Sequence, residues 1–200
     1  MRLHFAEILP PDIPRIALVD FYNTCVEESK RVLYAMFREY KRAFEQQDEE
    51  GMKRYTLFGV RADTAGELKD ESLAHPPDSP DLYGVSPALI WALREGLDNA
   101  WREWELPPEW QERAATYCRN VRIVASGGFT AEKLERFRAE GVPVDFYGIG
   151  SYFFANCSRC GTTNDYTADV VRIKVHGEWI DLAKVGRRAC DNPELLPVDY

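Results

Sequence analysis

The sequence lacks any long apolar run. No stretch approaches the roughly 20 consecutive apolar residues that a membrane-spanning helix requires. The first residues are interrupted by Glu7, Pro10 and Pro11, where a secretory signal needs an uninterrupted apolar segment. We therefore expect a protein with no membrane partner that resides in the cytoplasm.

Positive charge is in deficit. Lys and Arg number 25 against 33 Asp and Glu, which gives a formal net charge of −8 at pH 7. A general nucleic-acid binder presents a basic surface that displaces counterions from the phosphate backbone. We therefore expect no nucleic-acid partner. The charge balance still permits a local group of Arg and Lys that holds a small phosphate ester.

Residues that bind metals or form disulfides are scarce. The five cysteines are an odd, scattered set, unsuited to a disulfide framework, and the three histidines are isolated from one another. Cys157 and Cys160 have the spacing of half a zinc knuckle, but no second pair accompanies them and a structural zinc needs four ligands. Metal binding by this pair stays open, and two thiols on an irregular loop are the alternative.

What the sequence does contain is an alternation of short apolar segments and amphipathic ones. The apolar segments predict strands at residues 15–22, 55–63, 121–126 and 144–151. Three- and four-residue apolar spacing predicts four helices, over 25–45, 87–104, 109–117 and 131–140. Asn23 or Thr24 is expected to cap the first helix, and the charged stretch 46–53 to end it as a loop. Residues 168–176 and 178–184 predict a hairpin turning at His176 and Gly177.

Such alternation predicts an α/β fold with a parallel sheet and helices outside it. Two architectures are compatible with the pattern. One is an open doubly wound sheet. The other is part of a (β/α) barrel, whose complete form takes roughly 250 residues, so that four units correspond to about half.

Glycine is concentrated where the last two parallel strands end. Residues 126–128 read Ser-Gly-Gly and residues 148–151 read Gly-Ile-Gly-Ser. Glycine lets the backbone approach a ligand and present several amides to one anion, and the helix after Phe129 adds its positive N-terminus. We predict phosphate binding at these turns, with tight strand packing as the alternative. The candidate residues are Ser126, Gly127, Gly128, Gly148, Ile149, Gly150 and Ser151.

Charged residues follow the first two strands. Asp20 ends the first, and Arg61 and Asp63 end the second, where their alternation with Ala62 places both side chains on one side of the strand. Such groups are costly to bury unless they serve a ligand or each other. For Arg61 and Asp63 a structural ion pair stays open beside a site role. For Asp20 the alternative is capping of the next helix.

Together these strand ends resemble a known family. Residues 60–66 (VRADTAG), 124–129 (VASGGF) and 145–151 (DFYGIGS) closely resemble, in that order, the C-terminal half of nicotinate phosphoribosyltransferases, which are type II phosphoribosyltransferases. Residues 17–23 are similar to the family's preceding strand, and 169–188 to its closing hairpin and basic loop. The resemblance covers the chain from about residue 15 onward. It implies a partial (β/α) barrel of about four parallel strands plus a C-terminal β-hairpin.

The resemblance also implies a division of the chain and a set of roles. The segments are a lead-in over 1–14, a half-barrel with phosphate loops over 15–155, and a hairpin with tail over 156–200. The reaction implied is transfer of phosphoribose from phosphoribosyl pyrophosphate (PRPP) to nicotinate in NAD salvage. The glycine-turn amides would hold the 5′-phosphate, Arg61 would face the nicotinate carboxylate, and Asp63 would lie near the ribose hydroxyls and Mg²⁺. Asp20 would help to shape the same charged opening of the barrel.

Several alternatives stay open beside this assignment. The base transferred is nicotinate in the first hypothesis, and quinolinate or nicotinamide in the second. The third is a non-catalytic phosphate-binding or assembly subunit. Coupling to ATP, which family members often achieve through a phosphorylated histidine, is also open, because that histidine lies upstream of the Asp20 strand in a segment absent from this sequence.

The earlier barrel strands and the N-terminal domain of the family are absent from the sequence as well. Half a barrel leaves a bare strand edge and exposed apolar faces. We therefore expect a fragment, one subunit of a split enzyme, or a chain that assembles with itself into an oligomer. We expect this chain to be inactive when it is alone.

Overall fold

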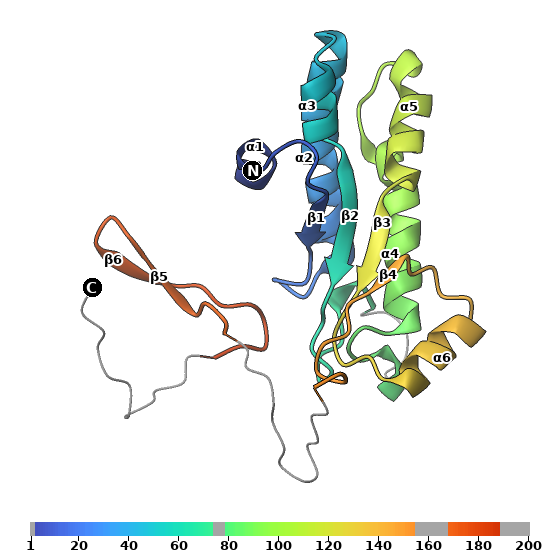
Figure 1. Ribbon diagram of the computed structural model, residues 1–200, viewed down its shortest axis with the longest axis vertical. Helices are drawn as coiled ribbons and strands as arrows, with labels where there is room; N and C mark the ends of the chain where they lie inside the picture. Colours follow the sequence, from blue (N-terminus) through green and yellow to red (C-terminus); the bar gives the residue numbers. More distant parts are fainter. Residues whose placement is uncertain (1–2, 74–78, 155–167, 189–200) are drawn as a thin grey trace.

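The computed structural model describes residues 3–73, 79–154 and 168–188 (Figure 1). The α-helices are α1 (His4–Ile8), α2 (Cys25–Glu45), α3 (Glu49–Arg54), α4 (Pro87–Asn99), α5 (Pro108–Arg119) and α6 (Ala131–Ala139). The strands are β1 (Arg15–Leu18), β2 (Leu57–Ala62), β3 (Arg122–Ala125), β4 (Phe146–Tyr147), β5 (Arg172–Val175) and β6 (Glu178–Asp181). Short 3₁₀ turns are η1 (Glu71–Leu73), η2 (Pro80–Leu82) and η3 (Ala100–Glu103).

The main sheet has four parallel strands in the order β1-β2-β3-β4. Its register aligns Leu18 with Arg61, Arg61 with Val124, and Val124 with Phe146, so that one row of side chains crosses all four strands. A doubly wound sheet reverses its strand order at a switch point, whereas a barrel keeps chain order. The observed order is therefore that of a barrel segment, and the predicted α/β class is confirmed.

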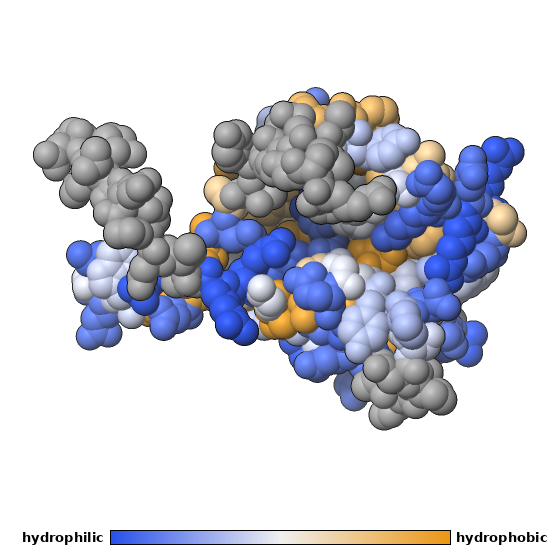
Figure 2. Space-filling model, turned by 90° about the horizontal axis from the view of Figure 1, so that it is seen from below, coloured by the Kyte–Doolittle hydropathy of each residue, from blue (hydrophilic) through white to orange (hydrophobic). Residues whose placement is uncertain are grey.

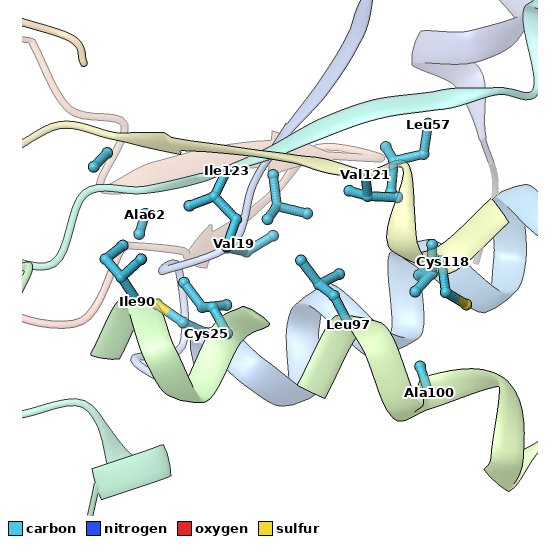
Figure 3. Packing of buried hydrophobic residues seen from close by; sticks show 14 of the residues in the cluster. Val19, Cys25, Leu57, Ala62, Ile90, Leu97, Ala100, Cys118, Val121 and Ile123 are labelled. Carbon is cyan, nitrogen blue, oxygen red and sulfur yellow. The ribbon is translucent and has the colours of Figure 1, made fainter. Parts of the chain in front are cut away.

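Helices cover one face of this sheet. Val60 and Ile123, which are paired in register, point toward the helices and are fully buried. They pack in one cluster with the apolar faces of α2 and α4, and Figure 3 shows Ile90 and Leu97 of α4 below Val19 and Ile123 of the sheet layer. Helix α2 contributes Leu33 and Phe37 to the same cluster. The burial of these side chains drives the two layers together.

The opposite face of the sheet carries no helix within the described residues. The row of side chains that crosses the sheet is exposed to solvent on this face: Leu18 is 45% exposed and Phe146 is 49% exposed. Arg61 and Val124, between them, are partly exposed. A doubly wound sheet covers both faces with helices, whereas a barrel keeps helices outside and turns the other face toward its axis. The exposed second face therefore also favours the half-barrel over the doubly wound sheet.

The charged stretch 46–53, which the sequence predicts to be a loop, contains helix α3. Its N-cap is Asp48, whose Oδ1 accepts a hydrogen bond from the Gly51 amide at 2.9 Å. Glu49 and Glu50 occupy the first turn, and basic residues occupy the last turn. This distribution complements the helix dipole. The loop prediction was wrong because capping and dipole signals outweigh the lack of an apolar stripe.

The predicted cap of α2 is confirmed in position, because Thr24 is the N-cap residue, but its side chain does not make the capping hydrogen bond. Asn23 instead adopts a left-handed conformation (φ 59°) and donates through its side chain to the Lys69 carbonyl at 2.8 Å. The Cys25 amide donates to Asp70 Oδ2 at 3.1 Å. Asp70, in the loop after β2, therefore caps α2. This contact connects the loop that follows β1 with the loop that follows β2.

Helix α1 lies in the lead-in over 1–14, where the sequence analysis predicts no helix, and, apart from α3, the other helices and strands agree with the predictions in place and differ in length. Segment 144–151 contributes only Phe146–Tyr147 to the sheet, and the helix predicted to reach Trp104 ends at Asn99 before η3. The hairpin β5–β6 turns at His176 (φ 50°) and Gly177 (φ 90°), as predicted, since a type I′ turn needs positive φ at both positions. This hairpin lies apart from the main sheet (Figure 1). In the described parts of the chain, no helix combines the length and apolar character needed to span a membrane.

Candidate functional site

The predicted site residues gather at the carboxyl edge of the main sheet. All four strands are parallel, so the segments after β1, β2, β3 and β4 emerge at the same edge. The arrows of β1, β2 and β3 point downward in Figure 1, and Figure 2 looks onto this edge from below. The visible surface there is largely hydrophilic, with smaller apolar patches between the charged groups.

The glycine turn after β3 needs glycine for two reasons. Gly127 (φ 94°) and Gly128 (φ 63°) are both left-handed, a conformation that residues with a side chain rarely adopt. A Cβ added at Gly127 would also lie 3.2 Å from Asp63 Oδ1. The Asp63 carboxylate therefore lies directly against this turn, as the sequence resemblance implies.

The two glycine turns are in contact. A Cβ added at Gly148 would lie 3.1 Å from the Ser126 Cβ, so the turn after β4 packs against the turn after β3. The Gly148 amide donates to the Ala125 carbonyl at 2.8 Å, and the Ser126 amide donates to the Ala62 carbonyl at 3.0 Å. These two amides extend the hydrogen bonding of the sheet, so they are not available to a phosphate.

Other amides of the two turns have no acceptor within the described residues. They belong to Gly127, Gly128, Ile149 and Gly150. Ser151 begins the turn 151–154 that follows. These four amides are the backbone donors of the two turns that a bound anion could use.

Helix α6 begins beside the turn, and its own side chains satisfy its N-terminus. Thr130 Oγ1 accepts from the Lys133 amide at 3.3 Å. Hydrogen bonds from its own amide and from Thr130 lower the pKa of Glu132. Lys133 Nζ donates to the Gly127 carbonyl at 3.1 Å and lies 4.3 Å from the centre of the Phe129 ring, and burial lowers its pKa. The ammonium group thus adds positive charge beside the glycine turn.

Arg61 and Asp63 form a loose pair. Arg61 Nη2 lies 3.8 Å from Asp63 Oδ2, which is too far for a direct hydrogen bond, and the side chains are 43% and 33% exposed. Such a pair contributes little stability. Arg61 Nε is buried and has no hydrogen-bond partner among the residues that the structure describes. The contact is therefore weaker than a hydrogen-bonded ion pair.

Asp20 occupies a different environment. Its side chain has no exposed surface, and its Oδ2 forms an ion pair with Lys184 Nζ. It does not cap α2 with its side chain; its backbone carbonyl accepts from the Asn23 amide at 3.3 Å. Burial raises the pKa of Asp20, and Lys184 opposes this rise. Because the Asp20 carboxylate has no exposed surface, it cannot contact a ligand directly in this structure.

Lys184 is the site residue that sequence reasoning did not single out. It belongs to the segment 169–188 that resembles the basic loop of the family, but nothing in the local pattern indicates its partner. The one feature of the sequence that could have indicated Lys184 is its position as a single lysine between Ala183 and Val185, directly after the hairpin. That signal is too weak to identify a contact with residues at the start of the chain.

The described residues offer a limited set of metal ligands. No three His, Cys, Asp or Glu side chains gather at one point in the described part of the chain, and Cys157 and Cys160 lie outside it. Mg²⁺ is commonly held by one or two carboxylates together with substrate phosphates. Asp63, partly exposed beside the glycine turn, fits that limited role, in which the ion would neutralise phosphate charge.

The site is an open edge, and the main cavities lie elsewhere. One cavity of about 790 Å³ lies among Val26, Glu27 and Gly96, and another of about 620 Å³ lies near the amino ends of β2 and β3, beside Thr56 and Arg122. Neither is lined by the residues of the glycine turns. No family model, curated protein or solved structure matches this chain.

Proposed function

We propose that this chain carries the phosphate- and base-binding edge of a phosphoribosyltransferase, which transfers phosphoribose from PRPP to nicotinate. The observation that supports this most is the pair of contacting glycine turns, which have four amides without an acceptor among the residues that the structure describes. Asp63 lies against the first turn and Arg61 lies 3.8 Å from Asp63, and these are the residues to which the resemblance to nicotinate phosphoribosyltransferases assigns the ribose and the base. A sugar phosphate bound there would place its ring near the Asp63 carboxylate.

The chemistry of the transfer suits these groups. Displacement of pyrophosphate from the anomeric carbon builds positive charge on the sugar ring, which a neighbouring carboxylate such as Asp63 stabilises. A planar guanidinium binds a carboxylate through two parallel hydrogen bonds, so Arg61 is suited to orient nicotinate. The main contribution of the protein would be alignment of the pyridine nitrogen with the anomeric carbon.

The open site supports a second part of the proposal. The sheet face that carries no helix is not covered by the described residues. We infer that another polypeptide or a second copy supplies the complementary half of the barrel, and that turnover requires it. Binding of a sugar phosphate to the isolated chain is therefore a better test of the site than turnover.

The test is calorimetric titration of the full chain with ribose 5-phosphate. Gly128→Ala should weaken binding about tenfold, because the added Cβ disturbs a backbone that presents two of the free amides. Gly141→Ala is the matched control. Gly141 has the same φ of 63°, is also exposed, and likewise has nothing within 4 Å of an added Cβ, but it follows the other end of α6.

Both variants should lose about 1 kcal/mol of stability from the strained φ. Only Gly128→Ala should change the dissociation constant. Absence of saturable binding by the wild-type chain, or equal loss in both variants, would contradict the proposed cradle. Binding of ribose 5-phosphate with no binding of any pyridine base would instead favour a non-catalytic phosphate-binding subunit.

A further inference from the structure

A segment near the C-terminal end of the described chain crosses the ends of β1 and β2. After the hairpin, the Val185 amide donates to the Phe21 carbonyl at 2.9 Å, which attaches the segment to the loop that follows β1. Gly186 lies against Leu68, because an added Cβ would approach the Leu68 Cδ1 to 2.9 Å. The segment therefore touches the loops that follow both strands.

Lys184 is the polar centre of this segment. Its Nζ forms the ion pair with Asp20 and also donates to the Asp63 backbone carbonyl at 2.9 Å. The Lys184 side chain is only 12% exposed. Lysine is rarely buried unless it is paired, and immobilising its long side chain costs conformational entropy. The Lys184 ammonium group thus connects the end of β1 to the end of β2. Its two contacts must offset the loss of side-chain entropy and of hydration.

The Asp63 end of this connection is the one that bears on the glycine turn. Lys184 holds the backbone of Asp63, while the Asp63 side chain lies 3.2 Å from the position of a Cβ at Gly127. A shift of the Asp63 backbone would therefore move its carboxylate relative to the turn. A displacement of about 1 Å is enough to impair a site that depends on alignment.

We propose that Lys184 is a positioning residue, which fixes the Asp63 carboxylate against the Gly127–Gly128 turn by joining the ends of β1 and β2. This inference rests on the proposed function for its consequence in ligand binding. Its structural part, the placement of Asp63 and of the glycine turn, stands independently of any ligand.

The experiment compares three variants of the full chain. Lys184→Met removes the ammonium group and keeps much of the length of the side chain. Lys184→Arg keeps a buried cation that can reach both partners. Lys30→Met is the matched control, because Lys30 is 23% exposed and forms ion pairs with Glu27 and with Glu103 at 2.7 Å, away from the glycine turns.

Two readouts separate this proposal from the proposed function. The first is the position of the Thr64 and Gly127 amide signals in ¹H–¹⁵N spectra of the ligand-free chain. The second is the dissociation constant for ribose 5-phosphate. Lys184→Met should shift both amide signals and weaken binding about tenfold or more. Lys184→Arg should restore both toward wild type, and Lys30→Met should change neither.

Unchanged amide signals and unchanged binding in Lys184→Met would overturn the proposal, and so would equal effects of Lys30→Met. Failure of the wild-type chain to bind ribose 5-phosphate would contradict the proposed function, and the amide signals would still decide the role of Lys184. If Lys184→Met does not fold, Lys184→Gln and Lys184→Arg decide: the proposal requires Lys184→Arg to resemble wild type more closely than Lys184→Gln does.

Discussion

Arg15 and Arg61 differ in how the terminal nitrogens of their guanidinium groups are satisfied, although the Nε of each is buried without a partner in the described residues. Arg15, at the start of β1, donates to the carbonyls of Pro10 at 2.7 Å and Leu9 at 2.8 Å, and also to those of Ala6 and Ile13. These bonds attach the N-terminal segment to the sheet. Arg61 has a buried Nε without a partner in the described residues and a loose contact to Asp63. The terminal nitrogens of Arg15 are hydrogen-bonded within the fold, whereas those of Arg61 have only the loose contact to Asp63 in the described part of the chain.

This difference gives a prediction about the base. If Arg61 binds the carboxylate of the base, the wild-type chain should bind nicotinate more tightly than nicotinamide. Arg61→Met should remove that preference, because a hydrogen-bonded charge pair contributes about 1.5–3 kcal/mol, which corresponds to roughly 10- to 100-fold in affinity. Calorimetric titration of both compounds measures it.

Arg122→Met provides the control for this comparison. Arg122 is exposed on β3 next to Gly59 in the register and is paired with Asp145 at 2.8 Å. It lies at the amino end of its strand, away from the glycine turns. A wild-type chain that binds the uncharged amide as tightly as the acid would count against Arg61 as the carboxylate-binding group. Quinolinate, which carries two carboxylates, tests the second hypothesis in the same titration.

Among the elements, α3 shows how a helix forms with hardly any apolar residues. It is six residues long, and Gly51 is its buried residue. A Cβ at Gly51 would clash with Asp48 Oδ2, because the helix start folds tightly around its cap. Such a short helix has little intrinsic stability, so it depends on capping and on packing against α2.

Removal of the cap should therefore be measurable. Asp48→Ala should lower the free energy of unfolding by about 1 kcal/mol, because the Gly51 amide loses its acceptor. Glu49→Ala, in the same first turn but without a capping role, should cost only about 0.3 kcal/mol through the helix dipole. Chemical denaturation of both variants checks this. Equal losses would show that charge, and not the cap, stabilises α3.

At the scale of the whole molecule, the two faces of the main sheet are unequal. One face is packed against α2 and α4, and the other exposes Leu18 and Phe146. Parallel sheets are normally covered on both faces. The exposed row consists of neighbouring residues on adjacent strands. It is apolar at Leu18, Val124 and Phe146 and carries one charged residue, Arg61.

The inequality predicts opposite responses to substitution on the two sides. Leu93, on α4, is fully buried, and Leu93→Ala should cost about 2–5 kcal/mol of stability. Leu18→Ser on the open face should change stability by no more than about 0.5 kcal/mol, the usual range for surface positions. It should also reduce binding of a dye that reports exposed apolar surface. Strong destabilisation by Leu18→Ser would mean that this face is covered in solution.

Much of the fold and part of the site follow from short-range patterns. The four strands and the main helices were predicted because apolar periodicity reflects which side chains face a core. The turns at residues 126–128 and at His176 and Gly177 were predicted because positive φ requires particular residue types. The contact between the glycine turns was expected because parallel strands end at one edge. Helix α3 was missed because its signals are caps and charges, and not periodicity.

The sequence by itself determined most of the elements, the parallel class of the sheet and the glycine turns, because each depends on neighbouring residues and on local backbone preferences, whereas the strand order came from the tertiary structure. Only the tertiary structure decided which amides remain free, that Asp70 caps α2, and that Lys184 joins Asp20 to the backbone of Asp63. These contacts unite residues from distant parts of the chain. No local spacing encodes such pairs, because they form only when burial of the core brings the loops after β1 and β2 together with the segment after the hairpin.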